Sequence, residues 1–77
     1  MFTGVDESII TELHDVGNLS PSILADRTGH HPKSISKRLS VLEDDGFVEN
    51  LGGVWALTIS GTRAAQSLKR GGGQGQA

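Results

Sequence analysis

The side chains best suited to chemistry in this sequence lie in one stretch, residues 31–46, which reads HPKSISKRLSVLEDDG. At about 100° per residue, a helix would turn Ile35, Leu39 and Leu42 to one side. Amines and hydroxyls, with no carboxylate before residue 43, would cover the opposite side and its flanks: Lys33, Ser34, Ser36, Lys37 and Ser40. These groups bind phosphates and the edges of bases, so the pattern predicts a helix that enters the major groove of DNA.

This helix is expected to span Pro32 to Asp45. Proline has the φ angle of a first helical turn and lacks an N–H that would be unpaired there. The proline pushes His31 to an extended backbone, so His31 is expected as N-cap and as a phosphate contact. Gly46 suits the left-handed turn that ends a helix. Because His30 and His31 have no third ligand near them in sequence, we expect no metal site.

Two further helices are expected before this one. Residues 3–16 carry an apolar stripe made of Val5, Ile9, Leu13 and Val16. Residues 19–28 form a shorter helix, with Ser20 as N-cap and proline at its first position. Gly29 then provides the turn into the helix at residue 32. Two short helices joined by a glycine-containing turn constitute a helix-turn-helix.

Short strands follow. Residues 47–50 and 54–57 flank a Gly-Gly pair, which indicates a β-hairpin. Its Trp55 is expected in the core. A last helix is expected from residue 59 to about residue 70, where Gly61 would cost up to roughly 1 kcal/mol relative to alanine. Residues 71–77, GGGQGQA, have nothing to bury and are expected to be a disordered tail.

Size and composition limit the possible functions. With 77 residues and 35% hydrophobic content, the chain suffices for one small domain, expected over residues 1–70. The absence of cysteine excludes disulfides and thiolate metal sites. No apolar run approaches the roughly 20 residues of a membrane span, and the start does not resemble a signal peptide. We therefore expect a cytoplasmic protein without a cofactor. No catalytic triad or carboxylate pair has a pocket to work in, which argues against an enzyme.

The formal net charge is −2, which alone argues against a nucleic-acid partner. The charge is segregated, however. Residues 1–26 and 43–50 contain acidic residues and no Lys or Arg, whereas residues 27–42 contain four Lys or Arg and no acid. Such segregation gives one face a local positive field that the total conceals.

The order of elements resembles the winged helix-turn-helix fold, an α+β, mostly α architecture with three helices, a two-stranded wing and a C-terminal helix. Residues 36–48, SKRLSVLEDDGFV, resemble the S-x-x-L-x-x-L and G-[LF]-V signature of the MarR and ArsR groups of transcriptional regulators. Residues 55–61, WALTISG, resemble their closing [YW]-x-L-T-x-x-G. Small haloarchaeal and phage repressor-like winged helices share the same pattern.

This resemblance implies a sequence-specific regulator of transcription on double-stranded DNA, expected to be a repressor and a homodimer on two half-sites. The implied DNA contacts lie on the helix 32–45 and in the wing: Lys33, Ser34, Ser36, Lys37, Arg38, Ser40, Asn50, Gly52 and Gly53. The wing departs from the family pattern because it contains no Lys or Arg. Arg38 lies nearer the apolar side, so a flanking phosphate and a pair with Glu43 are both open to it.

The alternative is a winged-helix module that binds protein and not DNA. The acidic total, the acidic first helix and the uncharged wing tip favour it, and the basic helix argues against it. Only DNA binding predicts an affinity that falls steeply as salt rises.

Overall fold

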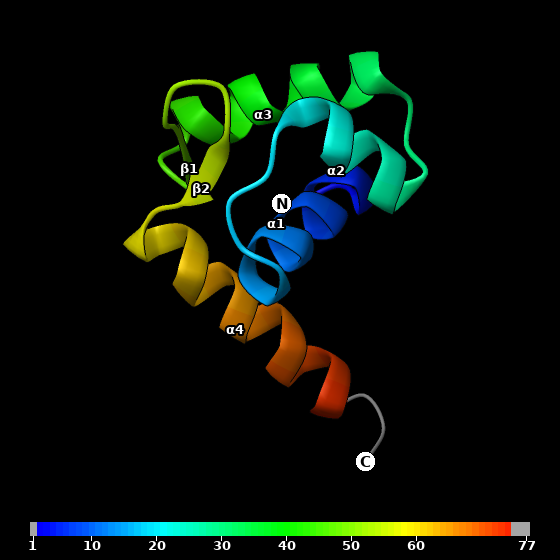
Figure 1. Cartoon of the computed structure of the whole chain (residues 1–77). Coiled ribbons are helices and arrows are strands. Elements are labelled where there is room, and N and C mark those ends of the chain that lie inside the picture. Colours follow the sequence, from blue (N-terminus) through cyan, green and yellow to red (C-terminus); the bar gives the residue numbers. More distant parts are fainter. Residues whose placement is uncertain (1, 75–77) are drawn as a thin grey trace.

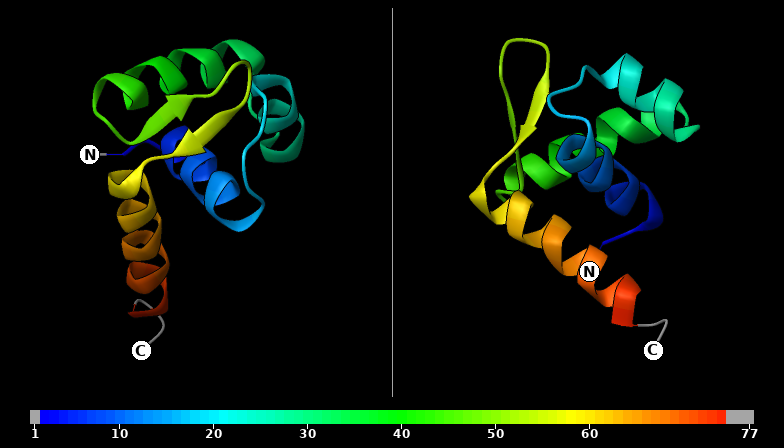
Figure 2. Two further views of the ribbon diagram at one scale, coloured as in Figure 1. Left: turned by 60° about the vertical axis from the view of Figure 1, so that its left-hand side comes forward. Right: turned by 60° about the horizontal axis from the view of Figure 1, so that its bottom comes forward.

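The computed structural model describes the backbone of residues 2–74 and the side chains of residues 2–70. In order, the elements are α1 (Gly4–Asp15), α2 (Pro21–Thr28), α3 (Pro32–Asp44), β1 (Val48–Asn50), β2 (Trp55–Leu57) and α4 (Ile59–Gln74). Figure 1 shows α1 and α2 packed against one side of α3, with the hairpin at the far end of α3. In Figure 2, α4 leaves the base of the hairpin, and it packs against α1 along part of its length. The expected winged helix-turn-helix architecture is confirmed.

Helix α1 begins with reciprocal hydrogen bonds between its cap and its third residue. The Thr3 hydroxyl accepts from the backbone N–H of Asp6, and the Asp6 carboxylate accepts from the N–H of Thr3. Ile9 and Leu13 are buried as predicted. The prediction was wrong for Val16, which is 49% exposed, because the helix ends at the preceding residue and the chain leaves the buried stripe.

The helix-turn-helix forms through the predicted caps. The Ser20 hydroxyl accepts from the N–H of Ile23, and Gly29 ends α2 with a left-handed φ of 75°. His31 is extended and caps α3, since its Nδ1 accepts from the N–H of Lys33 at 3.1 Å. The beginning of α3 is therefore set by side chains that precede it, as the sequence predicts.

The hairpin is antiparallel, with Val48 opposite Leu57 and Asn50 opposite Trp55. A further bridge joins Trp55 to Leu19, in the segment between α1 and α2. Trp55 is only 9% exposed, which confirms its predicted place in the core. The base of the wing is thus attached both to α3, through the short connection after Gly46, and to the α1–α2 segment.

Helix α4 continues further than expected. Thr58 begins it, accepting from the N–H groups of Gly61 and Thr62. The backbone is helical to Gln74, so residues 71–74 extend the helix into the stretch expected as a disordered tail. Glycine keeps both backbone hydrogen-bonding groups, so a helical ladder can pass through it. Residues 75–77 of that predicted tail lie outside the described residues.

One core joins all the elements. Its fully buried side chains come from all four helices and the hairpin, and include Ile9, Ile10, Leu24, Ile35, Leu39, Leu42, Val48 and Ala65. The three from α3 are those that the helical spacing predicts. The apolar face of α3 is therefore buried in the core, and its opposite face is exposed to solvent. Within the described residues, no helix is both long and apolar enough to cross a bilayer.

Candidate nucleic-acid interface

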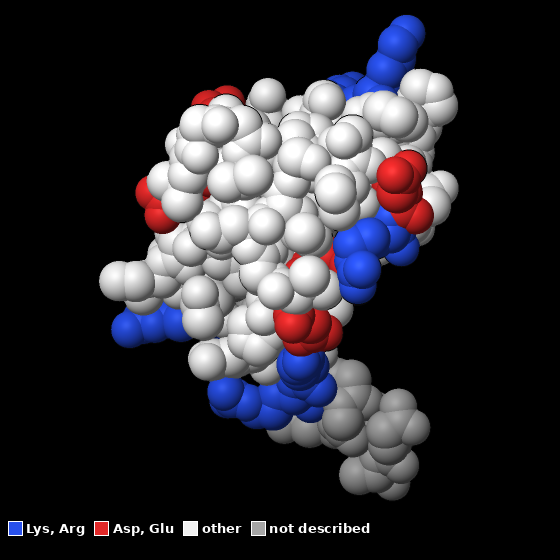
Figure 3. Space-filling view, in the orientation of Figure 1, with Lys and Arg blue, Asp and Glu red and all other residues white. Residues whose placement is uncertain are grey.

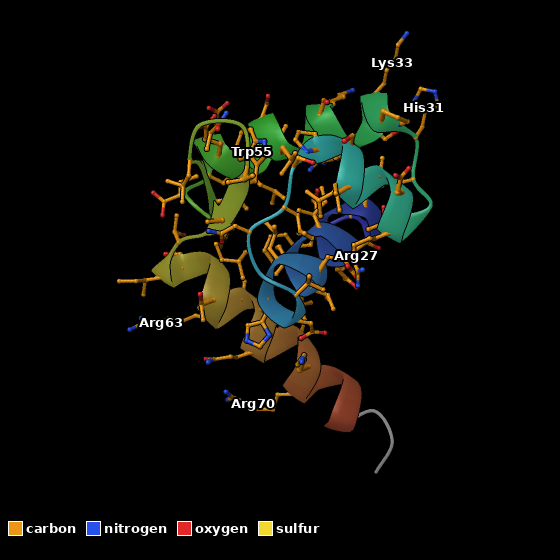
Figure 4. The ribbon with its side chains drawn as sticks, viewed as in Figure 1. Arg27, His31, Lys33, Trp55, Arg63 and Arg70 are labelled. Atoms are coloured by element: carbon orange, nitrogen blue, oxygen red, sulfur yellow. The ribbon has the colours of Figure 1, made fainter. Side chains whose placement is uncertain are left out.

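The outer face of α3 carries the predicted amines and hydroxyls. All five of its side chains are exposed: Lys33, Ser34, Ser36, Lys37 and Ser40. In Figure 4, Lys33 projects from the N-terminal end of α3, beside His31 and clear of the other elements. Because α1 and α2 lie on the opposite side of α3, a large ligand can approach this face without displacing any described element.

The two adjacent histidines, His30 and His31, form hydrogen bonds that fix the turn leading into α3. His31 uses Nδ1 to accept from Lys33, so a neutral ring carries its proton on Nε2, which remains a donor for a phosphate. His30 is hydrogen-bonded through Nε2 to the hydroxyl of Ser8 at 3.2 Å, which ties the turn to α1. Among the side chains of residues 2–70, no three His, Asp or Glu residues come together in a way that could hold a metal ion.

The cations divide into paired and unpaired groups. Three form ion pairs with carboxylates of α1: Arg27 with Glu12, Arg38 with Asp6, and Lys69 with Asp15. Among the described side chains, the other four have no carboxylate partner: Lys33 and Lys37 on α3, and Arg63 and Arg70 on α4. In Figure 4, Arg63 and Arg70 lie at the opposite end of the molecule from Lys33. Figure 3 shows Lys and Arg side chains both at the upper right and toward the lower end of the molecule. The unpaired positive charge therefore forms two separate groups.

The charges of α3 run against the helix dipole. Cations are favoured near the last turn of a helix and carboxylates near the first, each by about 0.3–1 kcal/mol. Helix α1 follows this rule at its beginning, with Asp6 and Glu7 in its first turn. Helix α3 reverses it, with Lys33 in the first turn and Glu43 near the C-terminal end. Helix stability therefore does not explain this order of charge.

Arg38 is oriented inward, toward α1. Its Nε donates to Oδ1 of Asp6 at 2.7 Å and its Nη2 donates to Oδ2 at 2.9 Å. The Asp6 side chain is only 1% exposed, and that of Arg38 is 25% exposed. The sequence leaves Glu43 and a phosphate open as partners of this guanidinium. The structure gives it a third partner, Asp6.

Asp6 makes part of the stability dependent on pH. Burial raises the pKa of its carboxyl, but hydrogen bonds from Arg38 and Thr3 and the charge of Arg38 outweigh burial, so the pKa lies below its ordinary value. A lowered folded-state pKa stabilises the fold above the unfolded pKa of about 3.9, and this contribution is lost as pH falls through the folded value. We expect the free energy of unfolding, measured with urea, to fall below about pH 4.

This pH dependence can be tested by replacing the ionisable side chain of Asp6 with a neutral one. Asp6→Asn should be less stable than wild type at neutral pH and should lose part of the decline in acid. Asp26→Asn removes an exposed carboxylate of α2 that has no ion pair among the described side chains, and it should follow the wild-type curve. Identical acid profiles for Asp6→Asn and wild type would contradict the assignment.

The wing is closed by its own hydrogen bonds. Asn50 accepts through Oδ1 from the N–H of Gly53 at 3.0 Å, and the N–H of Leu51 donates to the carbonyl of Val54. Gly52 and Gly53 have φ values of 69° and 106°, which favour glycine. Leu51 is 49% exposed at the tip. The wing can offer DNA only backbone N–H groups and the Asn50 amide, so a contact here stays a prediction.

From the sequence, Asp6 is a candidate cap of the first helix, but its pairing with Arg38 is not predicted. Its carboxylate lies three and seven residues before Ile9 and Leu13, on the buried side of α1. The signal was the T-x-x-D spacing of a capping box, which explains how a carboxylate is held at this end of the helix. The spacing alone does not reveal the arginine that reaches it from α3.

Comparison with known proteins gives a result that agrees with this geometry. A family model described as winged helix-turn-helix DNA-binding matches residues 3–49. The match runs from the N-cap of α1 into β1 and includes the whole of α3. Among curated proteins, no sequence matches the chain.

Proposed function

The chain belongs to the winged helix-turn-helix DNA-binding family, and we propose that it is a sequence-specific regulator of transcription that represses by binding double-stranded DNA. In this proposal, the outer face of α3 enters the major groove. The observation that carries it is the pair of exposed cations, Lys33 and Lys37, which have no carboxylate partner among the described side chains. The MarR or ArsR subtype stays a prediction.

The electrostatics of α3 support this role. An unpaired cation keeps its charge available for a phosphate, whereas a cation already held by a carboxylate does not. The reversed order of charge along α3 costs helix stability, and such local conflicts are expected at functional sites. Bound phosphates would neutralise Lys33 at the helix N-terminus. The proposed DNA contact therefore resolves the conflict.

The hydroxyls supply the means of reading sequence. Ser34, Ser36 and Ser40 are exposed on or beside the same face and can hydrogen-bond either base edges or phosphates. A major groove about 12 Å wide admits one α-helix. Lys33 and Lys37 can also reach the O6 and N7 atoms of guanine, each such contact being worth about 1–3 kcal/mol of discrimination when bidentate.

Useful specificity suggests two copies of the chain. A single module of this size buries roughly 600–1,000 Å² on DNA, at the low end for a specific complex. We propose a homodimer on two half-sites about 34 Å apart, or a multiple of that spacing, acting in the cytoplasm. Sedimentation with and without a two-site duplex tests the stoichiometry.

The direct test is fluorescence anisotropy of the full chain with pooled random duplex DNA over a salt series. Two or more phosphate contacts predict a slope of log affinity against log salt of about −2 or steeper, because each contact releases about 0.9 counterion. Selection from the pool should then enrich one sequence. Binding that is unaffected by salt would contradict the proposal.

One observation favours the second candidate, a protein-interaction module. Leu51 is 49% exposed at a wing tip that has no cation, which suits an apolar protein contact better than a phosphate. The absence of duplex binding at low salt would favour this candidate over the first.

A further inference from the structure

We propose that Arg38 is a positioning residue for DNA binding and not a DNA contact: together with Asp6 it fixes α3 on α1, so that Lys33 and Lys37 meet the groove in one register. This inference rests on the function proposed above. It separates the basic residues of α3 into two that meet DNA and one that holds the helix.

The first step is that Arg38 already binds a carboxylate through two of its five N–H groups. Two parallel N–H groups donate to the two oxygens of one carboxylate, at 2.7 Å and 2.9 Å. The N–H of Thr3 donates to Oδ2 of the same carboxylate at 3.0 Å. This fork geometry constrains the planes of both the guanidinium and the carboxylate, which a single contact from a lysine would not do.

The second step is that Arg38 cannot easily leave this partner. The Asp6 side chain is 1% exposed, so a departing guanidinium would leave a buried carboxylate without its counter-charge. That loss costs more than an exposed phosphate contact returns. Lys33 and Lys37 face no such cost, because among the described side chains they have no carboxylate to abandon.

The third step is that α3 needs a directional contact. Its other buried side chains, Ile35, Leu39 and Leu42, are aliphatic, and apolar burial has no preferred direction. A bidentate pair does have one, and it joins residues 32 positions apart on two helices. Because Arg38 follows Lys37 directly, a rotation of α3 that breaks the pair also moves the cation that is proposed to meet DNA.

The test uses two variants that break the same pair with opposite changes of charge. Arg38→Met removes a positive charge, and Asp6→Asn removes a negative one. For each full-length variant, affinity is measured for the selected duplex and for random duplex, at a temperature at which circular dichroism shows it folded. In both variants, the ratio of the affinity for the selected duplex to that for random duplex should fall about tenfold. This is roughly the discrimination that one base contact provides. A simple charge effect would instead lower both affinities in Arg38→Met and raise both in Asp6→Asn, with little change in their ratio.

Lys37→Met is the matched comparison for Arg38→Met, since it removes one neighbouring cation from the same helix. It should make the salt slope shallower by about one, whereas Arg38→Met should leave the slope at its wild-type value. If Arg38→Met lowers the slope as Lys37→Met does, Arg38 contacts phosphate and the inference is wrong.

Other outcomes are equally decisive. A wild-type specificity ratio in folded Arg38→Met and Asp6→Asn would reduce the pair to a purely structural role and overturn the inference. Wild-type protein that binds all duplexes equally has no register to fix, which overturns the inference and leaves DNA binding intact. Wild-type protein that binds no DNA removes the proposed function, and this inference with it.

Discussion

Replacing Lys33 and Lys37 together with alanine is expected to weaken binding to the selected duplex by about 100-fold at moderate salt, the value of roughly two base or phosphate contacts. The salt slope should become shallower by about two, because two fewer phosphates would lose their counterions. Both side chains are exposed and, among the described residues, make no ion pair, so folding should be unaffected. Anisotropy over a salt series measures affinity and slope together.

The chain contains its own control for this double variant. Arg63→Ala with Arg70→Ala removes the same amount of charge from α4, at the opposite end of the molecule from Lys33. Only the long-range field should change, and salt screens that field beyond about 10 Å at 0.1 M. We expect a loss of at most a few-fold. Equal losses in the two double variants would mean that net charge, and not the face of α3, determines binding.

The two faces of α3 could be predicted because they follow from periodicity alone. Once Pro32 and His31 fix the beginning of the helix, a rotation of about 100° per residue assigns every side chain to a side. Ile35 and Leu39 are buried accordingly, and Lys37 is exposed. The helix-turn-helix could be predicted for the same reason, since its caps and its glycine turn are local signals.

The contacts between elements could not be predicted in this way. Arg38 lies at the boundary between the two faces of α3, and its partner depends on where α1 passes. The wing poses the same difficulty at a smaller scale. The side-chain oxygen of Asn50 accepts from the N–H of Gly53 within the turn, a contact that the sequence does not reveal, while the expected DNA contact of Asn50 stays a prediction. In each case the sequence shows a polar side chain but not its partner within the fold.

Gly61 shows how a contact between elements can reverse the effect on stability that the sequence predicts for a residue. From sequence, a glycine in the first turn of α4 only weakens the helix. In the fold, a Cβ at this position would lie 2.0 Å from the carbonyl oxygen of Phe47 and 3.0 Å from Cδ2 of Leu57. That carbonyl already accepts from the N–H of Thr58, and the Phe47 ring packs edge-on against Phe2. The backbone that would have to move is therefore held from both sides.

Gly61→Ala is consequently expected to destabilise the protein by about 3 kcal/mol, although alanine is the better helix former by about 1 kcal/mol. This is a large share of the roughly 4–11 kcal/mol that a domain of this length has in total. Gly4→Ala is the matched control, because no atom lies within 4 Å of a Cβ there and its φ is not positive. Urea unfolding should show that variant unchanged or slightly more stable. A Gly61→Ala protein as stable as Gly4→Ala would mean that α4 can move away from the base of the wing at little cost. The attachment of α4 to the wing would then not be the fixed junction that its contacts indicate.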